Sequence, residues 1–142
     1  MSVAKKGCTC FYLELNLQTQ TIKYADSGIG VAYLLREGEL TELRDEGGLI
    51  LGVMEDATYT EGEIQLGKGD VILVGSDGIT DIENQDGERY GDDRLKALLS
   101  TYHTTGSKKG LKTQVESSLT SFCGSLELPK DDITFLTLEA LK

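Results

Sequence analysis

Cysteine and histidine are scarce in this sequence, with three cysteines and one histidine among 142 residues. Cys8 and Cys10 are separated by a single residue, one fewer than in the Cys-x-x-Cys motifs of metal and redox sites. Together with Cys123, they are expected to be free, buried or half-buried thiols in a reducing compartment. His103 ends a helix-like segment, where a solvated side chain is a better interpretation than a catalytic base.

Long apolar runs and positive charge are also missing. No apolar run approaches the ~20 residues that a membrane-spanning helix needs, and the first residues lack the apolar stretch of a signal peptide. The 24 acidic residues outnumber the 14 basic ones, which gives a net charge of −10. This sign argues against nucleic acid and anionic membranes as partners, because both attract basic proteins, and most of the excess serves solubility. A cytoplasmic protein is the simplest prediction.

Short apolar segments with glycine-rich turns fill the first half of the chain, and helix-like stripes follow. Alternating side chains predict strands at 8–16, 21–26, 31–36, 40–44, 49–53, 58–66, 71–75 and 133–138. Apolar residues at helical spacing predict two helices that cover a sheet face, marked by Leu95, Leu98, Leu99 and Tyr102 and by Leu111, Val115, Leu119 and Phe122. Since no linker or repeat interrupts the pattern, residues 1–142 are predicted to form one α+β domain.

Two aspartate-containing segments lie at the ends of strand-like runs. The run of residues 71–76 ends at Asp77-Gly78, and Asp131-Asp132 immediately precedes the run that begins at Ile133. If these strands pair antiparallel, Asp77 and the Asp131-Asp132 pair project from the same rim of the sheet. Carboxylates gathered there favour a hard divalent cation, because like charges repel unless a cation shields them.

Each of these segments also has a simpler interpretation. Asp-Gly after a strand is more often a plain turn, and a doubled aspartate before a strand is usually a solvated strand entrance. The two segments together, with the elements between them, are more specific than either one alone.

Several motifs resemble the C-terminal half of PPM-type, metal-dependent serine/threonine phosphatase domains, and most closely the bacterial SpoIIE/RsbU-like branch. The motifs are Gly47-Gly48-Leu49-Ile50-Leu51-Gly52-Val53, Gly69-Asp70-Val71-Ile72-Leu73, Ser76-Asp77-Gly78-Ile79-Thr80-Asp81, Asp86-Gly87-Glu88-Arg89-Tyr90-Gly91 and Asp131-Asp132-Ile133-Thr134. They follow the order and spacing of that branch over residues 8–139.

The resemblance implies antiparallel sheets flanked by helices, with the N-terminal part of the usual domain missing. It also implies a two-metal centre of Mn²⁺ or Mg²⁺ that activates water for attack on a phosphoryl group. Asp77 and Asp131 would then be metal ligands, supported by Gly78, by Asp132 through hydrogen bonds, and by Asp81 as an outer-shell or third-metal residue. The substrates implied are phosphorylated regulatory proteins such as anti-sigma-factor antagonists.

Two departures from the family lower the activity expected of this chain alone. Gly28-Ile29 stands where the family has Gly-His, and the N-terminal half that supplies further metal ligands is absent. The first hypothesis is therefore a phosphatase module that is weak or inactive as this chain. The alternative is a non-catalytic pseudophosphatase that acts as a regulatory protein-binding module. A third hypothesis is an acidic β-domain whose aspartates only shape turns.

Missing strands would also leave sheet edges exposed, which proteins seldom tolerate. The apolar side chains expected near this gap are Phe11, Leu13, Leu15, Ile22 and Tyr24. The sequence thus predicts a homodimer through exposed sheet edges. A closed dimer is favoured over open aggregates, because the net charge of −10 opposes non-specific association.

Overall fold

The computed structural model describes residues 6–45, 48–105, 110–124 and 132–141. The elements, in chain order, are β1 (Cys10–Asn16), β2 (Thr21–Ser27), β3 (Val31–Arg36), β4 (Glu39–Glu42), β5 (Glu61–Gln65), β6 (Val71–Gly75), α1 (Gly78–Asp81), α2 (Gly91–Thr105), α3 (Leu111–Cys123) and β7 (Phe135–Glu139). No helix in this part of the chain is long and apolar enough to cross a bilayer.

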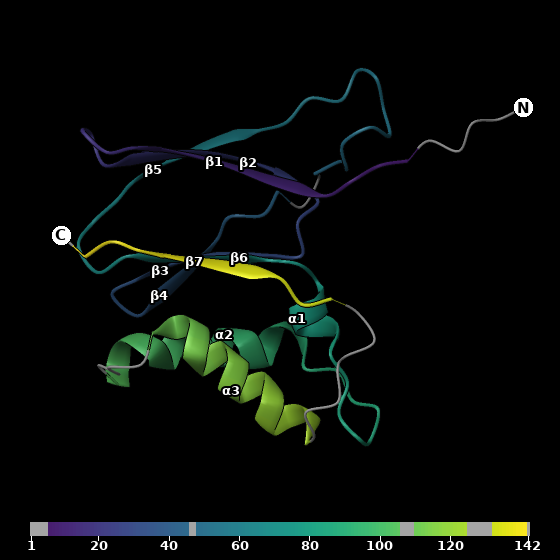
Figure 1. The fold of residues 1–142 in the computed structure, drawn as a ribbon. Helices are drawn as coiled ribbons and strands as arrows, with labels where there is room; N and C mark the ends of the chain where they lie inside the picture. Colours follow the sequence, from purple (N-terminus) through teal and green to yellow (C-terminus); the bar gives the residue numbers. More distant parts are fainter. Residues whose placement is uncertain (1–5, 46–47, 106–109, 125–131, 142) are drawn as a thin grey trace, which may run out of the picture.

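The elements form three layers, as Figure 1 shows. One sheet has the strand order β1-β2-β5, and it stacks on a second sheet with the order β4-β3-β6-β7. Helices α2 and α3 cover the other face of the second sheet. All strand pairs are antiparallel, so the molecule is the α+β fold that the sequence predicts.

Hairpins set the register of both sheets. The β1–β2 hairpin pairs Leu15 with Ile22 and Leu13 with Tyr24. The β3–β4 hairpin turns at Glu37 and Gly38, whose φ angles are 51° and 83°. Two successive positive φ angles are typical of the tight turns whose twist matches that of the paired strands.

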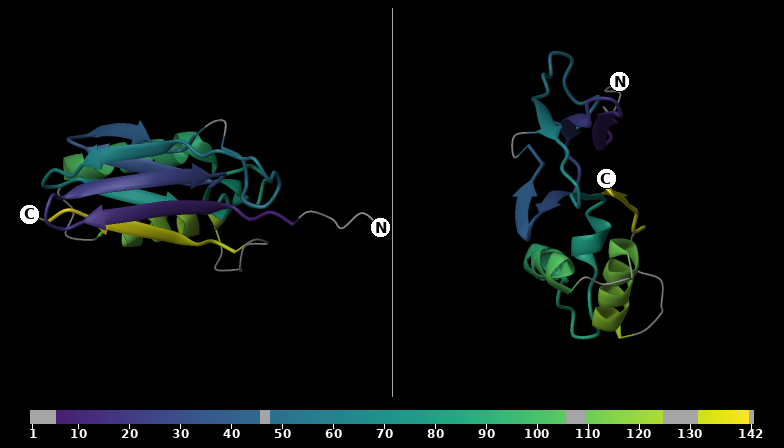
Figure 2. Two further views of the ribbon diagram at one scale, coloured as in Figure 1. Left: turned by 90° about the horizontal axis from the view of Figure 1, so that it is seen from above. Right: turned by 90° about the vertical axis from the view of Figure 1, so that its left-hand side faces the viewer.

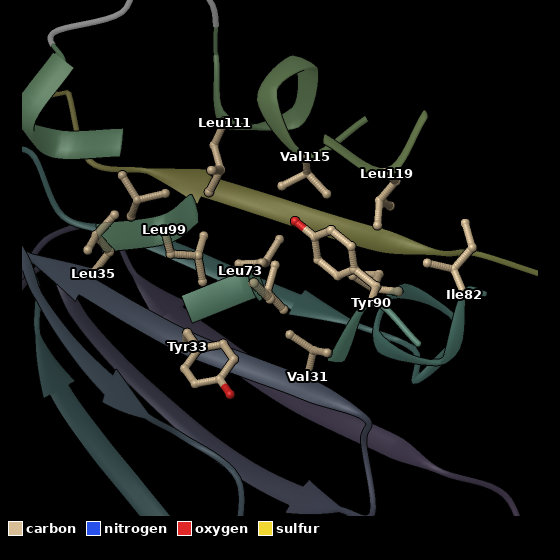
Figure 3. Close-up of a cluster of buried hydrophobic side chains, with 13 residues drawn as sticks. Val31, Tyr33, Leu35, Leu73, Ile82, Tyr90, Leu99, Leu111, Val115 and Leu119 are labelled. Carbon is tan, nitrogen blue, oxygen red and sulfur yellow. The ribbon is translucent and has the colours of Figure 1, made fainter. Parts of the chain in front are cut away.

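The main core lies between the second sheet and the helices (Figure 3). Leu95 and Leu99 of α2 and Val115 of α3 are fully buried there, so the helical stripes are core-packing residues as predicted. Tyr33 of β3 is 2% exposed, and its hydroxyl makes no hydrogen bond within the described part of the chain. Burial above all, and then the charges of Asp92 and Glu42, raise the pKa of Tyr33 to about 12.

A second core fills the space between the two sheets. Its buried members are Ile22, Ala32, Leu34, Leu43, Ile64 and Ile72. Phe11, Leu13 and Leu15 of β1 pack against this cluster but are only half-buried. The interior of the sandwich is therefore less well covered along β1 than at its centre.

The strands β1 and β7 lie along the same side of the sandwich, and each is the last strand of its sheet (Figure 2). Leu136 of β7 pairs with Val74, on the sheet face that carries Leu138 toward the other sheet. The side chain of Leu136 is nevertheless 59% exposed. We call the side of the sandwich along β1 and β7, with Phe11, Leu13, Leu136 and Leu138, the open side of the sandwich.

The buried carboxylate of Asp70 links the turn between β5 and β6 to β3. Asp70 accepts hydrogen bonds from Arg36 Nε at 3.0 Å, from Arg36 Nη2 at 2.6 Å and from the backbone N–H of Gly67 at 2.7 Å. Only 3% of the Asp70 side chain is exposed, against 45% for Arg36. The same Arg36 nitrogen also donates to the Gln65 carbonyl at 2.6 Å, so one arginine holds the ends of three elements.

Three sequence expectations need correction. The strand predicted at 49–53 is wrong, because only an isolated bridge between Leu51 and Cys8 forms there. Cys8 is exposed, although Cys10 and Cys123 are half-buried as expected and all three are free thiols. The one-turn helix α1 was not predicted, because four residues carry no periodic signal.

Candidate functional site

Strands β6 and β7 are antiparallel neighbours, as the sequence predicts, so the end of one lies beside the start of the other. Gly75 pairs with Phe135, and the pairing continues past it through Ser76. Ser76 N–H donates to the Thr134 carbonyl at 2.9 Å, and Thr134 N–H donates to Ser76 Oγ at 3.2 Å. The segments after β6 and before β7 therefore share one rim of the second sheet, where Figure 1 places α1.

Asp77 is the first residue after this junction, and its carboxylate has no structural role in the described part of the chain. Its backbone angles are helical, at φ −63° and ψ −14°, and it occupies the N-cap position of α1. Its side chain makes no capping hydrogen bond, whereas its carbonyl accepts from Thr80 N–H at 3.0 Å and Asp81 N–H at 2.9 Å. The exposed carboxylate is thus left available to a ligand.

Two glycines allow the backbone to close around Asp77. A Cβ on Gly30 would lie 2.2 Å from the Asp77 nitrogen, and a Cβ on Gly78 would lie 2.5 Å from the Asp132 carbonyl oxygen. Distances this short exclude any side chain at either position. Gly78 therefore lets the exposed Asp132 approach the start of α1, and its supporting role at a metal site stays a prediction.

Asp81 lies one helical turn after Asp77, on the same side of α1. Its Oδ1 accepts a hydrogen bond from Arg89 Nη1 at 3.2 Å. The structure therefore gives Asp81 a positively charged partner, which sequence reasoning did not anticipate. We call Asp77, Asp81 and Asp132 the carboxylate rim.

Asp131, the second predicted metal ligand, lies outside the described residues. The neighbouring Asp132 is described, and its carbonyl accepts a hydrogen bond from Ser76 Oγ at 3.4 Å, just before β7. The joint role of Asp77 and Asp131 stays a prediction.

The donor chemistry of the rim fits a hard divalent cation in kind, because exposed aspartate oxygens are ligands that Mg²⁺ and Mn²⁺ accept. The described residues offer few metal-ligating side chains here. No group of three or more histidine, cysteine, aspartate or glutamate side chains within the described residues is arranged to hold a metal ion. Asp77 and Asp132 can contribute to such a site, but they do not complete one.

Asp26 shapes the loop beside Asp77, and sequence reasoning missed it. Only 3% exposed, it accepts hydrogen bonds from Ile29 N–H and Asp45 N–H, both at 2.9 Å. Its carboxylate thus fixes the turn that leads into Gly30, which touches Asp77. The signal available in the sequence was an aspartate three residues before a turn amide, a common arrangement in Asx turns.

Comparisons with known proteins agree with this fold. The sequence profile described as Stage II sporulation protein E (SpoIIE) matches residues 2–141. The phosphoserine phosphatase RsbU of Bacillus subtilis is 28% identical over 113 residues, which cover 78% of this chain and 33% of RsbU. The chain thus spans a third of the length of this curated relative.

Two solved structures show the same fold. The SiaA-PP2C domain of Pseudomonas aeruginosa matches with a TM-score of 0.66 and 24% identity, over 86% of this chain and 47% of that one. The phosphatase domain of the cell fate determinant SpoIIE from Bacillus subtilis, presoaked with Mn, matches with a TM-score of 0.66 and 16% identity, over 92% of this chain and 56% of that one. Because the family profile covers nearly the whole sequence, the chain belongs to the Stage II sporulation protein E (SpoIIE) family.

Proposed function

We propose that residues 1–142 form the C-terminal portion of a metal-dependent serine/threonine phosphoprotein phosphatase domain. The observation that carries this proposal is the pairing of β6 with β7, which brings Asp77 and Asp132 to one rim. The Asp77 carboxylate makes no capping hydrogen bond, so a turn-forming role does not account for it. This argues against the hypothesis that the aspartates only shape turns.

In this proposal Asp77 and Asp131 are metal ligands, and Gly78, Asp81 and Asp132 support them. Bound Mn²⁺ or Mg²⁺ would supply an activated water and positive charge for phosphomonoester hydrolysis. The chain's own residues hold hard oxygen donors at an open edge of the sheet. Because the described donors do not complete a site, we expect weak or no activity from this chain alone.

The proposed substrate is a phosphorylated regulatory protein of the anti-sigma-factor antagonist type. The match to RsbU, which is named a phosphoserine phosphatase, supports a phosphorylated serine as the target group. The exposed position of Asp77 suits a phosphorylated residue carried by another protein, because such a residue needs an accessible rim.

A second candidate function is a pseudophosphatase that binds regulatory proteins without hydrolysing them. The shortage of metal-ligating groups in the described part of the chain favours it. The two functions differ in what happens when the chain is extended by the part of the domain that the solved relatives have in addition.

Phosphate release from a phosphoserine protein in Mn²⁺ separates the two functions. The assay compares this chain with a version extended at its N-terminus to the length of the solved relatives. We expect release by the extended version that is lost in Asp77→Asn and kept in Asp56→Asn, an exposed aspartate far along the chain from the rim. No release by either version would contradict the phosphatase proposal and favour the pseudophosphatase.

We also propose that this chain forms a homodimer through its exposed sheet edges. The open side of the sandwich carries two unpaired strand edges, β1 and β7, and an inward-facing leucine that is 59% exposed. Edges of this kind pair readily with another strand. A second copy of the chain could therefore cover Leu136 and the half-buried side chains of β1.

A further inference from the structure

Arg89 brings a positive charge to the carboxylate rim. Its Nη1 lies 3.2 Å from Oδ1 of Asp81, which lies one helical turn from Asp77 on the same side of α1. The three side chains of the carboxylate rim are acidic, and the whole chain carries a net charge of −10. A phosphate dianion approaching this rim would be repelled by its carboxylates unless cations offset them.

The backbone of Arg89 is held in place by several contacts. Arg89 forms an isolated antiparallel bridge with Glu83, and the next residue, Tyr90, donates its N–H to the Ile82 carbonyl at 2.8 Å. The carbonyl of Arg89 accepts from Arg94 Nη1 at 2.8 Å. Arg94 is itself fixed, because its guanidinium lies 4.7 Å from the centre of the Phe122 ring.

The loop that leads into Arg89 is also tightly built. Asn84 Oδ1 accepts from the N–H groups of Asp86 at 3.0 Å and Glu88 at 2.9 Å, and the Asn84 N–H donates to the Glu88 carbonyl at 2.9 Å. Gly87 supplies the positive φ of 78° that the turn needs. The position from which the Arg89 side chain extends is therefore set before any ligand binds, which lowers the entropy lost on binding.

The guanidinium group of Arg89 is still accessible. Its side chain is 67% exposed, and in the described part of the chain Asp81 is the one hydrogen-bond and ion-pair partner of the guanidinium. A guanidinium has five N–H donors, so most of them remain for another acceptor. An exposed ion pair of this kind contributes little to folding stability, so stability alone is a poor reason for the arrangement.

We propose that Arg89 binds the phosphate group of the substrate, with Asp81 orienting the guanidinium toward the rim. Arginine suits this task because its planar donors match phosphate oxygens and its charge does not titrate at neutral pH. The assignment rests on the phosphatase function proposed above and deepens it. It also gives Asp81 a role as the partner of an arginine instead of a metal ligand.

The test measures binding, so it gives a result even if this chain has no phosphatase activity. A short peptide carrying a non-hydrolysable phosphonate in place of phosphoserine is titrated into the chain in diamagnetic Mg²⁺, beside the same peptide with alanine. We expect the Arg89 Nε–Hε resonance to shift only with the phosphonate peptide. Affinity for that peptide should fall about tenfold in Arg89→Gln and less in Arg89→Lys, because lysine keeps the charge but not the planar donors.

The matched control is Lys112→Gln, which removes an exposed positive charge paired with Glu116 on α3. It should leave phosphonate binding unchanged, and the melting temperatures of all variants should agree. Equal binding by Arg89→Gln and the wild type would overturn the proposal, as would a wild type that does not distinguish the two peptides. Failure of the phosphatase function appears separately, as no phosphate release by the extended version.

Discussion

The Asp77 carboxylate is exposed and makes no capping hydrogen bond, and the chain carries a net charge of −10. Removing its charge should therefore leave stability unchanged or raise it slightly. We expect Asp77→Asn to unfold within about 0.5 kcal/mol of the wild type in urea at neutral pH, as surface substitutions usually do. A loss of several kcal/mol would show that Asp77 is a structural residue.

Tyr33 offers a prediction with a defined pH window. Its pKa is raised from 10.0 to about 12, chiefly by burial, so folding favours the protonated phenol. The corresponding stabilisation is complete below about pH 10 and is lost as the pH rises through about 12. The wild type should therefore lose unfolding free energy over this interval, and Tyr33→Phe should lose less.

At neutral pH the same substitution removes a buried hydroxyl that has no partner in the described structure. Tyr33→Phe should be neutral or stabilising by up to about 1 kcal/mol, because no hydrogen bond is lost. Urea unfolding at pH 7 and above pH 10 measures both effects, with Tyr59→Phe as the control for loss of one hydroxyl. Marked destabilisation at pH 7 would contradict the unpaired state of the hydroxyl.

The sequence predicted the position of residues at a strand end, and missed the residues that make contacts between distant segments. Asp77 and Gly78 were found because they follow an apolar run. Asp26 and the pairing of Asp81 with Arg89 were not, because a hydrogen bond or an ion pair between two loops leaves no periodic pattern.

At the scale of elements, the ion pair between Arg36 and Asp70 joins β3 to the turn before β6. Asp70→Ala would leave the Gly67 N–H and part of the guanidinium without their acceptor. We expect a loss of about 2–4 kcal/mol, somewhat below the value for fully buried pairs because Arg36 is half-exposed. Chemical denaturation measures it.

The control for this prediction is Glu61→Ala, which breaks the exposed pair with Lys23 between β2 and β5. Exposed pairs contribute about 0–1 kcal/mol, so this variant should unfold nearly like the wild type. If both variants lost the same small amount of unfolding free energy, the Asp70 pair would not stabilise the fold as its burial indicates.

Among the elements, the strands at 31–36 and 71–75 were predicted with correct bounds because they are buried on both faces and read as continuous apolar runs. The segment 49–53 is also apolar, but it forms a loop with Leu49, Ile50 and Leu51 partly exposed. It lacks the neighbours that would pair with it along its length, apart from the single bridge to Cys8. Composition alone does not show whether an apolar segment has a neighbouring strand to pair with.

At the scale of the whole molecule, the open side of the sandwich predicts self-association. Light scattering at micromolar concentration should give the mass of a dimer, with an interface on the order of 2,000 Å² or more in total if it is obligate. Leu136→Lys, in the exposed leucine of β7, should shift the population toward monomer. A clean monomer mass for the wild type would show that the two sheets close their own core.

Paramagnetic Mn²⁺ tests whether the carboxylate rim belongs to a divalent-cation site. Titrated into the isotope-labelled chain, Mn²⁺ should broaden the amide resonances of residues 76–81 and 132–134 first. This broadening should disappear in Asp77→Asn and persist in Asp56→Asn. Broadening centred elsewhere, or unchanged in Asp77→Asn, would show that the carboxylate rim is not the divalent-cation site.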